Sequence, residues 1–437
     1  MFATPSAIRA AVMCQKADIA ALFDALKMGS REGDGVTRDT YGRGEQFAHQ
    51  LIVNHAHAMG LETHCDHASN LFMTLAGKDR SQPCLMTGSH LDSVANGGNF
   101  DGAAGVIAGL VAIKSLQRVG LQPMCDITTV AMRAEESVWF QVSYIGSRSA
   151  FGTLPDGALE ARRVDTGRTL AEHMAECGAD IDAVRSGVAS LNAELVRGFV
   201  ELHIEQAPQL VEAGIPVAIG TGVPGNFRYP RVKIIGEYAH VGLPRRFRRD
   251  AALAGSDFAV GLDEIWRKDD AASRPMAFTI GRFHTDPKDH ALTKVPGEMT
   301  LSLDVRAYDK AHLHELEAAV LSLIRDIERR RGVNFELGTR TSADVAPSHP
   351  GVLAKLTEAA NALGIATMPL ASPASHDTAT FTSAGVPSAM LFVRNTNGSH
   401  NPREAMEIDD FLQGVTVLTG WLAAEATSTH WAQTRPL

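Results

Sequence analysis

The chain has 437 residues, a hydrophobic fraction of 45% and a net charge of −9 at pH 7. This length is too great for one ordinary domain and suits two, and the negative charge argues against a nucleic-acid partner, despite the local basic run Arg245–Arg249. No apolar run approaches the ~20 residues of a membrane span, and the first residues lack a signal-peptide pattern. The five cysteines show no paired spacing, which favours reduced thiols in the cytoplasm.

The first half of the chain alternates predicted helices and strands, judged from the spacing of its apolar residues. Helices are expected over residues 16–28 and 41–59 and from about residue 106, and strands over residues 62–75 (two short ones), 83–87, 126–132 and 198–202. After a separate block, residues 351–363, 375–384 and 408–424 return to the same rhythm, with one more strand over 388–393. This order predicts an α/β fold with a mixed sheet.

The separate block, residues 223–342, contains the pattern of strand, helix and strand twice. Strands are expected over residues 232–238, 276–283, 298–305 and 332–339, and long helices over 250–268 and 310–330. The pattern predicts a four-stranded α+β domain with two helices on one face. We therefore expect a discontinuous catalytic domain, residues 1–222 and 343–437, with an inserted domain over residues 223–342.

Polar side chains follow the strand predicted over residues 83–87. His90 and Asp92 are two residues apart, so an extended backbone would point both to one face. Glycines at 97, 98 and 102 surround Asp101 and let the backbone fold tightly about its carboxylate. Open α/β sheets place their chemistry at such carboxyl ends of strands. Taken alone, His90 and Asp92 are better explained as a strand end with a solvated turn, and only the matching groups at other strand ends favour a site.

Other strand ends supply matching groups. Glu135 and Glu136 follow the strand over residues 126–132, and two adjacent carboxylates repel unless a dication or a shared proton holds them. One can bind metal while its neighbour moves protons. His203 lies at the end of the strand over 198–202, and His400 lies in the loop after the last strand. Two surface glutamates and a core histidine are the alternative interpretation of these residues.

Together, His90, Asp101, Glu136, His203 and His400 are imidazoles and carboxylates without a thiolate. This set suits two divalent ions such as Zn²⁺, with Mn²⁺, Co²⁺ or Ni²⁺ as alternatives, if Asp101 bridges them. Each ion then keeps an open position for water, as in a hydrolytic site. Asp92 is expected to orient His90, and Glu135 is left as a general base.

At this point the residues show a family resemblance over nearly the whole chain. The chain resembles the dinuclear-zinc amidohydrolases that include aminoacylases and acetylornithine deacetylase, and within them the branch of N-carbamoyl-L-amino-acid amidohydrolase, β-ureidopropionase and allantoate amidohydrolase. The matching strings are Gly88–Val94 with Gly97–Gly102, Glu135–Glu136, Gly146–Arg148, Glu201–Gln206, Ala239–His240, Arg249–Ala251, Val295–Gly297, Leu303–Arg306, Ser375–Asp377 and Ser399–Pro402. Their order is specific to the family, and the Glu201–Gln206 string points to this branch.

The resemblance implies roles for individual residues. It assigns His90, Asp101 and His203 to one ion, and Asp101, Glu136 and His400 to the other. It implies a homodimer built through the inserted domain, which closes onto the site, and makes His240 the group that polarises the substrate carbonyl, reaching the partner subunit's site. Gln206, Arg306 and His376 become candidates for substrate contacts, with Arg306 grasping a carboxylate. Without the family, His240 would be interpreted as a surface histidine and Arg306 as a solvated strand residue.

Some pocket positions depart from the branch. Trp139 stands where an arginine is frequent, and Thr293 stands where the branch usually has a substrate-binding asparagine. The segment after His240 is also unusual. The expected function is metal-dependent hydrolysis of the C–N bond of an N-carbamoyl amino acid. The alternatives are an allantoate-type amidohydrolase, or an N-acyl-amino-acid deacylase or dipeptidase with an atypical substrate.

Two other classes are disfavoured by the sequence. A nucleotide-binding oxidoreductase would need Gly-x-Gly-x-x-Gly, which the loop Gly97–Gly102 lacks, and Asp101 would repel a pyrophosphate. A non-catalytic scaffold would have no use for the base Glu135 beside the ligand Glu136. We expect no nucleic acid and no membrane among the partners.

Overall fold

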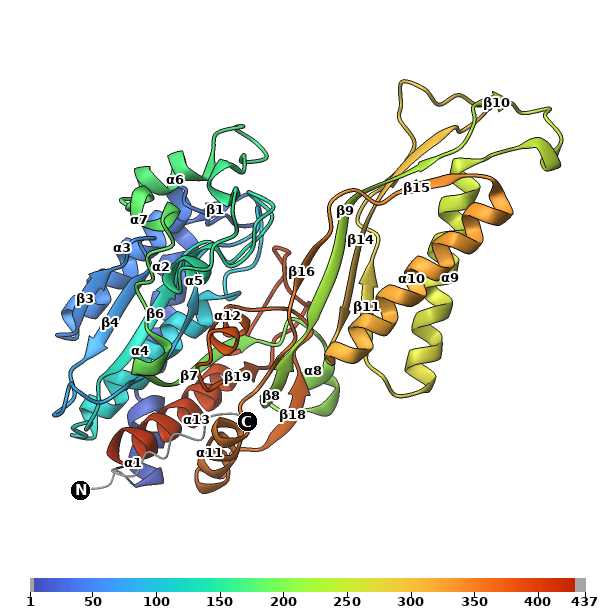
Figure 1. Cartoon of the computed structure of the whole chain (residues 1–437). Helices are drawn as coiled ribbons and strands as arrows, with labels where there is room; N and C mark the ends of the chain where they lie inside the picture. The colour runs from blue at the N-terminus through green and yellow to red at the C-terminus, as the bar shows by residue number, and fades with distance from the viewer. Residues whose placement is uncertain (1–3, 429–437) are drawn as a thin grey trace. The chain divides into compact units, whose positions relative to one another are not determined.

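The computed structural model describes residues 4–428, and the chain divides into two compact units (Figure 1). Unit 1 takes the segments up to Val223 and from Pro347, and unit 2 comprises Pro224–Ala346. The sequence placed the second boundary after residue 342. The structure places it after Ala346, because β16 (Thr341–Ala343) pairs with β9 (Gly225–Ile235) of unit 2.

A nine-stranded mixed sheet forms the centre of unit 1, in the order β17-β8-β19-β7-β5-β6-β4-β3, with β18 paired to β8. Its four central strands are parallel to one another: β19 (Ser388–Val393), β7 (Val196–Ile204), β5 (Cys84–His90) and β6 (Ile127–Met132). The carboxyl ends of parallel strands meet at one edge of the sheet. This edge therefore receives the segments that the sequence analysis singled out.

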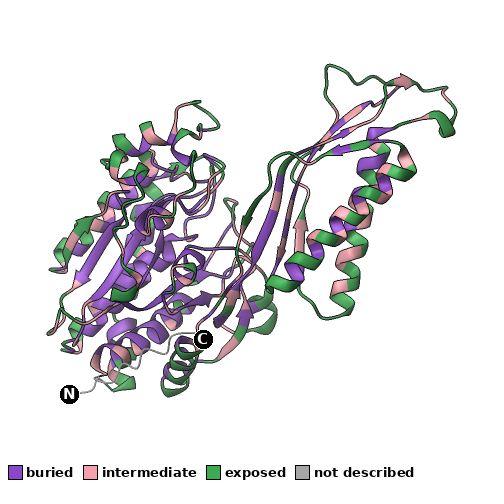
Figure 2. Cartoon of the chain, viewed as in Figure 1, coloured by how far each residue is buried: buried purple, intermediate pink, exposed green. Residues whose placement is uncertain are grey.

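The central strands are buried on both faces, which explains their continuous apolar sequences (Figure 2). In β5, Leu85 joins the large core that contains α4 (Ala103–Arg118) and α13 (Ile408–Thr427), whereas its neighbour Met86 packs in a second cluster. This second cluster includes Phe381 of α12 (Thr378–Ser383). Helices thus cover both sides of the sheet and leave only its edge for chemistry.

The other elements of unit 1 are the outer strands of this sheet and the elements around it. They are α1 (Pro5–Met13), α2 (Lys16–Gly29), β1 (Arg31–Glu32), β2 (Gly35–Val36), α3 (Arg43–Ala58), β3 (Glu62–Cys65), β4 (Leu71–Leu75), α5 (Ile145–Ala150), η1 (Ala158–Glu160), α6 (Leu170–Glu176), α7 (Ile181–Arg185), η2 (Ala193–Leu195), α8 (Gln209–Ala213), β8 (Val217–Val223), β17 (Ala346–Pro347), α11 (Pro350–Ala362) and β18 (Thr367–Ala371). The sequence patterns did not predict α5, α6 and α7, because helices this short show too little periodicity.

Unit 2 contains a six-stranded sheet rather than the four-stranded one expected. The predicted strands appear as β9, β11 (Met276–Thr279), β14 (Glu298–Ala307) and β15 (Asn334–Glu336), and the short strands β12 (Phe283–His284) and β16 add to β14 and β9. Strands of two or three residues are too short to be found from alternation. Beyond this sheet, β10 (Ala239–His240) pairs with β13 (Lys294–Val295), and η3 (Arg245–Phe247) follows β10.

The sheet of unit 2 is covered on one face only. Every second residue of β14, from Met299 to Ala307, is buried, and these residues pack with α9 (Ala251–Ala271) and α10 (Lys310–Arg331) (Figure 2). The alternating pattern is the one expected for a half-covered antiparallel sheet. Unit 2 therefore has a core of its own.

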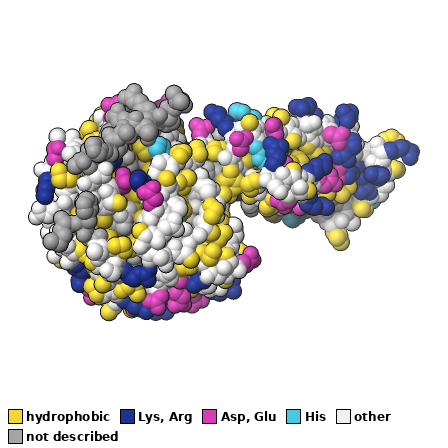
Figure 3. Space-filling model, turned by 90° about the horizontal axis from the view of Figure 1, so that it is seen from below, with side chains coloured by type: hydrophobic (Ala, Val, Ile, Leu, Met, Phe, Trp, Pro, Cys, Tyr) yellow, Lys and Arg dark blue, Asp and Glu magenta, His cyan; other side chains and the backbone are white. Residues whose placement is uncertain are grey.

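The surface charge, the cysteines and the helix lengths add three further observations. Lys and Arg side chains gather over unit 2 on the face shown in Figure 3, and the basic residues Arg245 and Arg246 of η3 are exposed. All five cysteines are free thiols. None of the helices within residues 4–428 combines the length and the apolar character needed to cross a bilayer.

The close packing of β5 against β6 yields a stability prediction. Gly88 has a φ of +141°, and a Cβ there would lie 1.9 Å from the carbonyl oxygen of Val130. Gly88→Ala should lower the free energy of unfolding by at least about 3 kcal/mol, because the cost of the strained backbone and the cost of overpacking against Val130 are summed. Gly120→Ala, at a φ of +67° with no atom within 4 Å, should cost only about 1 kcal/mol. If urea unfolding shows the same decrease in the free energy of unfolding for both variants, the close approach of β5 and β6 at Gly88 is contradicted.

Candidate metal centre

The carboxylate of Asp101 lies between two clusters of candidate ligands. Its Oδ1 is 3.5 Å from Nε2 of His90 and 3.2 Å from Nε2 of His203. Its Oδ2 is 3.5 Å from Nε2 of His400, which is 3.3 Å from Oε1 of Glu136. Within each triad, one ligand atom per residue lies within 4.8 Å of the others. One carboxylate thus offers an oxygen to each triad.

The two buried histidines are oriented by groups behind them. Nδ1 of His90 is 3.1 Å from the carbonyl oxygen of Asp92 and 3.2 Å from its Oδ1. Nδ1 of His203 is 2.9 Å from the carbonyl oxygen of Ile204, and its Nε2 accepts the backbone N–H of Gly102 at 3.1 Å. Acceptors at Nδ1 keep the proton there, which leaves Nε2 as the nitrogen that can bind a metal. At His203 an ion would take the place of the Gly102 N–H at Nε2.

Asp92 connects the loop after β5 to the loop after β6. Its carboxylate accepts the backbone N–H groups of Glu135 at 3.0 Å and of Glu136 at 3.1 Å, and the hydroxyl of Thr40 at 2.6 Å. Asp92 therefore fixes the glutamate pair as well as His90. This wider role follows from the backbone contacts, which the sequence alone did not indicate.

The loop after β19 brings further groups to Asp101. The hydroxyl of Ser399 lies within hydrogen-bond distance of two carboxylates, Oδ2 of Asp101 and, at 2.6 Å, Oε2 of Glu404, and can donate to one of them at a time. Glu404 accepts the backbone N–H of Phe100 at 2.8 Å. Nε2 of Gln206, a residue expected to contact substrate, donates to Oδ2 of Asp101 at 2.7 Å. In this structure Gln206 therefore contacts the shared ligand.

The remaining candidates of the sequence analysis fall into separate places. In unit 1, the ring of His376 is buried 4.4 Å from that of His203 and its Nε2 is 3.1 Å from the hydroxyl of Ser372. In unit 2, exposed His240 pairs with Lys294, and the carbonyl of Thr293 accepts the N–H of Val241. Arg306 lies near the other end of β14 and forms an ion pair of 3.1 Å with Asp304.

Three non-glycine residues of the centre have left-handed backbones: Ala134, Gln206 and His400 have φ values of 58°, 65° and 59°. Such conformations persist only where surrounding contacts enforce them, and they concentrate at functional sites. At Ala134 the backbone N–H is held by Oε1 of Glu45 at 2.9 Å. This turn carries Glu135 and Glu136 away from the end of β6.

The charges of the centre shift the proton affinities of its members. Burial raises the pKa of Glu135 well above its usual value, His90 opposes this, and the charge of Glu136 adds to it. The hydrogen bond to Glu136 raises the pKa of His400 to about 9. Glu135 thus has the environment of a proton acceptor with raised basicity.

The residues present fit a pair of divalent ions. Both triads consist of imidazole nitrogens and carboxylate oxygens, the donors that Zn²⁺ and similar ions prefer. Without cations, Asp92, Asp101, Glu135 and Glu136 would bring four largely buried carboxylates together. Such a group needs positive charge close by.

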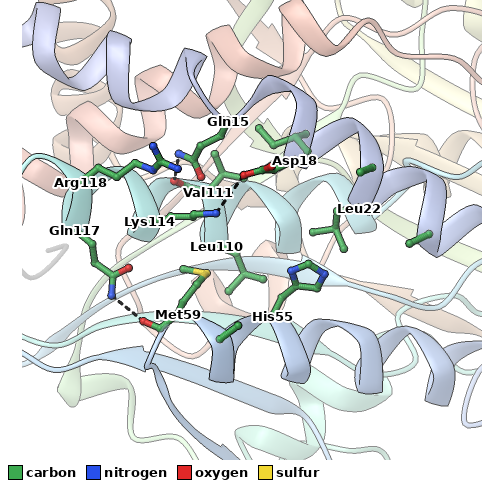
Figure 4. A pocket seen from close by; sticks show the side chains of 14 residues that line it. Gln15, Asp18, Leu22, His55, Met59, Leu110, Val111, Lys114, Gln117 and Arg118 are labelled. Carbon is green, nitrogen blue, oxygen red and sulfur yellow. Dashed lines mark hydrogen bonds and ion pairs between the residues drawn. The ribbon is translucent and has the colours of Figure 1, made fainter.

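A different cavity of about 730 Å³ lies between α2, α3 and α4 (Figure 4). Its lining is largely apolar, with Leu22 and Leu110 among its members, and Lys114 forms an ion pair of 3.4 Å with Asp18. The lining contains a single imidazole, His55, and a single carboxylate. It therefore lacks a ligand set like that around Asp101.

Comparisons with known proteins identify the family. The sequence matches peptidase family M20/M25/M40 over residues 86–424. The chain belongs to this family. It is 32% identical to the N-carbamoyl-L-amino acid amidohydrolase of Geobacillus stearothermophilus over 410 residues. This alignment covers 92% of this chain and 97% of that protein. It is 30% identical over 401 residues to the allantoate amidohydrolase of Escherichia coli strain K12, with coverage of 89% and 93%.

The solved structures agree with this assignment. An amidase of the hydantoinase/carbamoylase family from Burkholderia multivorans superimposes with a TM-score of 0.81 at 25% identity, over 94% of this chain and 98% of that one. The predicted family, the α/β fold class and the prediction that the chain is an enzyme are therefore confirmed. Enzymes of the M20 family use divalent metal ions, for which the two triads offer donors.

Several residues that contact this centre received no role in the sequence analysis. Arg38, Thr40, Glu45, Ser399 and Glu404 all contact ligand-bearing loops. Only Ser399 and Glu404 gave a signal, through their closeness to His400. Trp139, noted only as a departure, donates to the carbonyl of Ser93 at 2.9 Å and lies under the guanidinium of Arg163.

The pKa of His400 predicts how metal affinity depends on pH. A ligand nitrogen must lose its proton before it binds an ion, and in the metal-free protein His400 keeps its proton up to about pH 9. Affinity at the triad of Asp101, Glu136 and His400 should therefore rise with pH and level off near pH 9. Chelator competition between pH 6.5 and 9.5 measures this. An affinity independent of pH would contradict ligation by His400.

Proposed function

We propose that this protein hydrolyses the C–N bond of an N-carbamoyl amino acid to give the amino acid, carbon dioxide and ammonia. The observation that carries the proposal is the position of Asp101, which offers one oxygen to each of two triads, beside a buried Glu135 that belongs to neither. A shared carboxylate with an adjacent free base is the arrangement expected of a two-metal hydrolase.

Each residue then has a definite task. His90, Asp101 and His203 would hold one ion, and Asp101, Glu136 and His400 would hold the other, most favourably Zn²⁺. Bound there, the ions would supply a Lewis acid that makes a water acidic at neutral pH. Glu135 takes the proton of that water and later gives it to the leaving nitrogen. Asp92 holds Glu135 by its backbone N–H, so the base keeps its place while its charge changes.

The substrate class follows from the relatives and from the donors available. The proteins similar to this chain act on N-carbamoyl-L-amino acids and allantoate by name. Gln206 and His376 in unit 1 and Arg306 in unit 2 are candidates for holding the substrate, Arg306 by its carboxylate. Thr293, in place of the usual asparagine, and Trp139 keep an allantoate-type or N-acyl substrate as the alternative.

The geometry of unit 2 supports a homodimer. Arg306 lies eight residues along β14 from Glu298, and His240 lies beyond that end of the strand. At the rise of an extended strand this separates them by more than roughly 25 Å. One small substrate cannot touch both within one chain. We therefore assign His240, as the group that polarises the carbonyl, to the partner's site, with unit 2 as the dimerisation domain.

Replacing the proposed base tests the mechanism. Glu135→Gln removes the proton acceptor but none of the proposed metal ligands, so turnover should fall by roughly 10²- to 10⁴-fold while metal content stays unchanged. The neighbouring Glu136→Gln is the matched control and should lose metal as well as activity. Metal analysis and steady-state kinetics measure both. Undiminished activity of Glu135→Gln would exclude this role.

The same variant tests the contribution of the partner subunit. Mixed dimers of Glu135→Gln and His240→Ala contain one site in which both groups are intact, if His240 acts across the interface. Random mixing should then restore about a quarter of the wild-type activity. If His240 acts within its own chain, mixing inactive protomers should restore none.

A product assay tests the substrate class. Carbamoyl, acetyl and dipeptide derivatives of the same amino acids, with allantoate, are offered to the protein, and ammonia and free amino acid are measured with and without a chelator. Carbamoyl amino acids should give both products, and the chelator should abolish them. Release of amino acid from the acetyl derivative alone would replace the carbamoyl assignment by the deacylase alternative.

A further inference from the structure

An N-terminal segment reaches the metal centre before the region that matches the family begins. Val36 of β2 exchanges backbone hydrogen bonds with Gly97, at 3.0 and 2.8 Å. Two residues later, the N–H of Arg38 donates to the hydroxyl of Ser93 at 2.9 Å, and the N–H of Ser93 donates to the carbonyl of Arg38 at 2.8 Å. This segment is therefore paired with the loop that carries His90, Asp92 and Asp101.

The side chain of Arg38 is completely buried and divides its donors between two parts of that loop. Its Nε donates to the carbonyl of Leu91 at 2.6 Å, directly after the ligand His90. Its Nη1 donates to Oδ1 of Asn99 and its Nη2 to the carbonyl of Asp101, both at 3.3 Å. One rigid, planar guanidinium thus joins the backbone of both loop segments that carry ligands.

Arg38 is also a buried charge with no ion-pair partner among residues 4–428 at the usual distance. Its counter-charges are spread over four carboxylates: Glu404, Asp101, Asp92 and Glu136 raise its pKa, in that order, against the larger lowering effect of burial. An arginine keeps its proton in such surroundings. The four carboxylates include the shared ligand Asp101, the ligand Glu136 and the group that holds both glutamates.

We propose that Arg38 is a positioning residue that serves as a fixed internal cation and keeps the metal centre assembled in the metal-free protein. It compensates the carboxylates before divalent ions bind, and its hydrogen bonds keep the segments of His90 and Asp101 in register. Once ions are bound, they supply the positive charge and the guanidinium becomes less important. This inference rests on the proposed metal centre, and it adds a function for a segment outside residues 86–424.

The charge and the hydrogen bonds of Arg38 predict opposite effects on metal affinity. A guanidinium near the site repels incoming dications, so its removal favours their binding once the protein is folded. A group that only orients ligands does the reverse, and its loss typically weakens metal binding by 10- to 100-fold. We expect the effect of the charge to be the larger one. The loss of Arg38 then destabilises the metal-free form more than the metal-loaded form.

The test compares the thermal unfolding of full-length variants with and without Zn²⁺. Arg38→Met should lower the Tm of the metal-free protein by roughly 6 to 20 °C, because four carboxylates lose their buried cation. The Tm of the metal-loaded protein should fall by less than half as much, and chelator competition should show a tighter metal affinity, since the folded metal-free form is the one that loses stability. Arg38→Lys, which keeps the charge but not the three-way hydrogen bonding, should lie between wild type and Arg38→Met.

A matched control separates this effect from the loss of any buried arginine. Arg197, at the start of β7, is buried with its guanidinium 3.6 Å from Glu425 and does not touch the centre. Arg197→Met should lower both Tm values equally. Equal shifts for Arg38→Met, or a metal affinity that is unchanged or weaker, would overturn the proposal.

The outcomes also separate this inference from the proposed function. A wild-type protein that binds no divalent ion refutes the metal centre itself. A protein that binds ions and turns over substrate, but whose Arg38→Met variant behaves like Arg197→Met, refutes only the role of Arg38. If Arg38→Met folds only when it is expressed with metal, this supports the proposal, and if it never folds, the same comparison is made with Arg38→Gln, which also removes the charge but keeps an N–H donor.

Discussion

The shared carboxylate of Asp101 is the constraint on which the rest of the centre depends. Its two oxygens face different triads, so its position must satisfy both at once. That position is set from several directions: the loop glycines allow the tight turn, Ser399 and Gln206 hold Oδ2, and Arg38 holds the backbone carbonyl. The four parallel strands of the sheet then bring the other ligands to the same edge, where they meet this one carboxylate.

Most of the contacts around this centre stabilise its buried carboxylates. Asp92 uses its oxygens on two backbone N–H groups and a hydroxyl, and Glu404 uses its own on the Phe100 and Asp101 backbone. Hydrogen bonds from neutral donors stabilise a carboxylate without adding a full charge. Arg38 is the buried guanidinium that spans the loop of His90 and Asp101. A site built in this way is assembled before its ions arrive, which favours a defined coordination geometry over one induced by binding.

Unit 2 depends on the apolar packing of helices against one face of a sheet. Its sheet is half covered by α9 and α10, and the length of β14 separates the candidate Arg306, near one end of this strand, from His240, beyond the other end. The proposed metal ligands are of the residue types that the family resemblance implies, while Thr293, Trp139 and the segment after His240 depart from it. Chemistry performed by ions needs fixed ligands, whereas selectivity for a substrate is adjusted through the groups around them. We therefore regard the substrate pocket as the part of this protein in which its own specificity lies.

The sequence by itself determined the family, the α/β class, the principal strands and the residues His90, Asp101, Glu136, His203 and His400 as candidates, because periodic apolar runs and residue types at strand ends are local properties. It did not indicate Arg38, Thr40 or Glu45, nor the helices α5 to α7 and the two short strands of the second sheet. Arg38 lies 53 residues from Leu91 along the chain, and nothing in its neighbours marks it as part of a centre. Only the tertiary structure decides such contacts, since buried charges and backbone carbonyls find their partners through the packing of distant segments and not through sequence spacing.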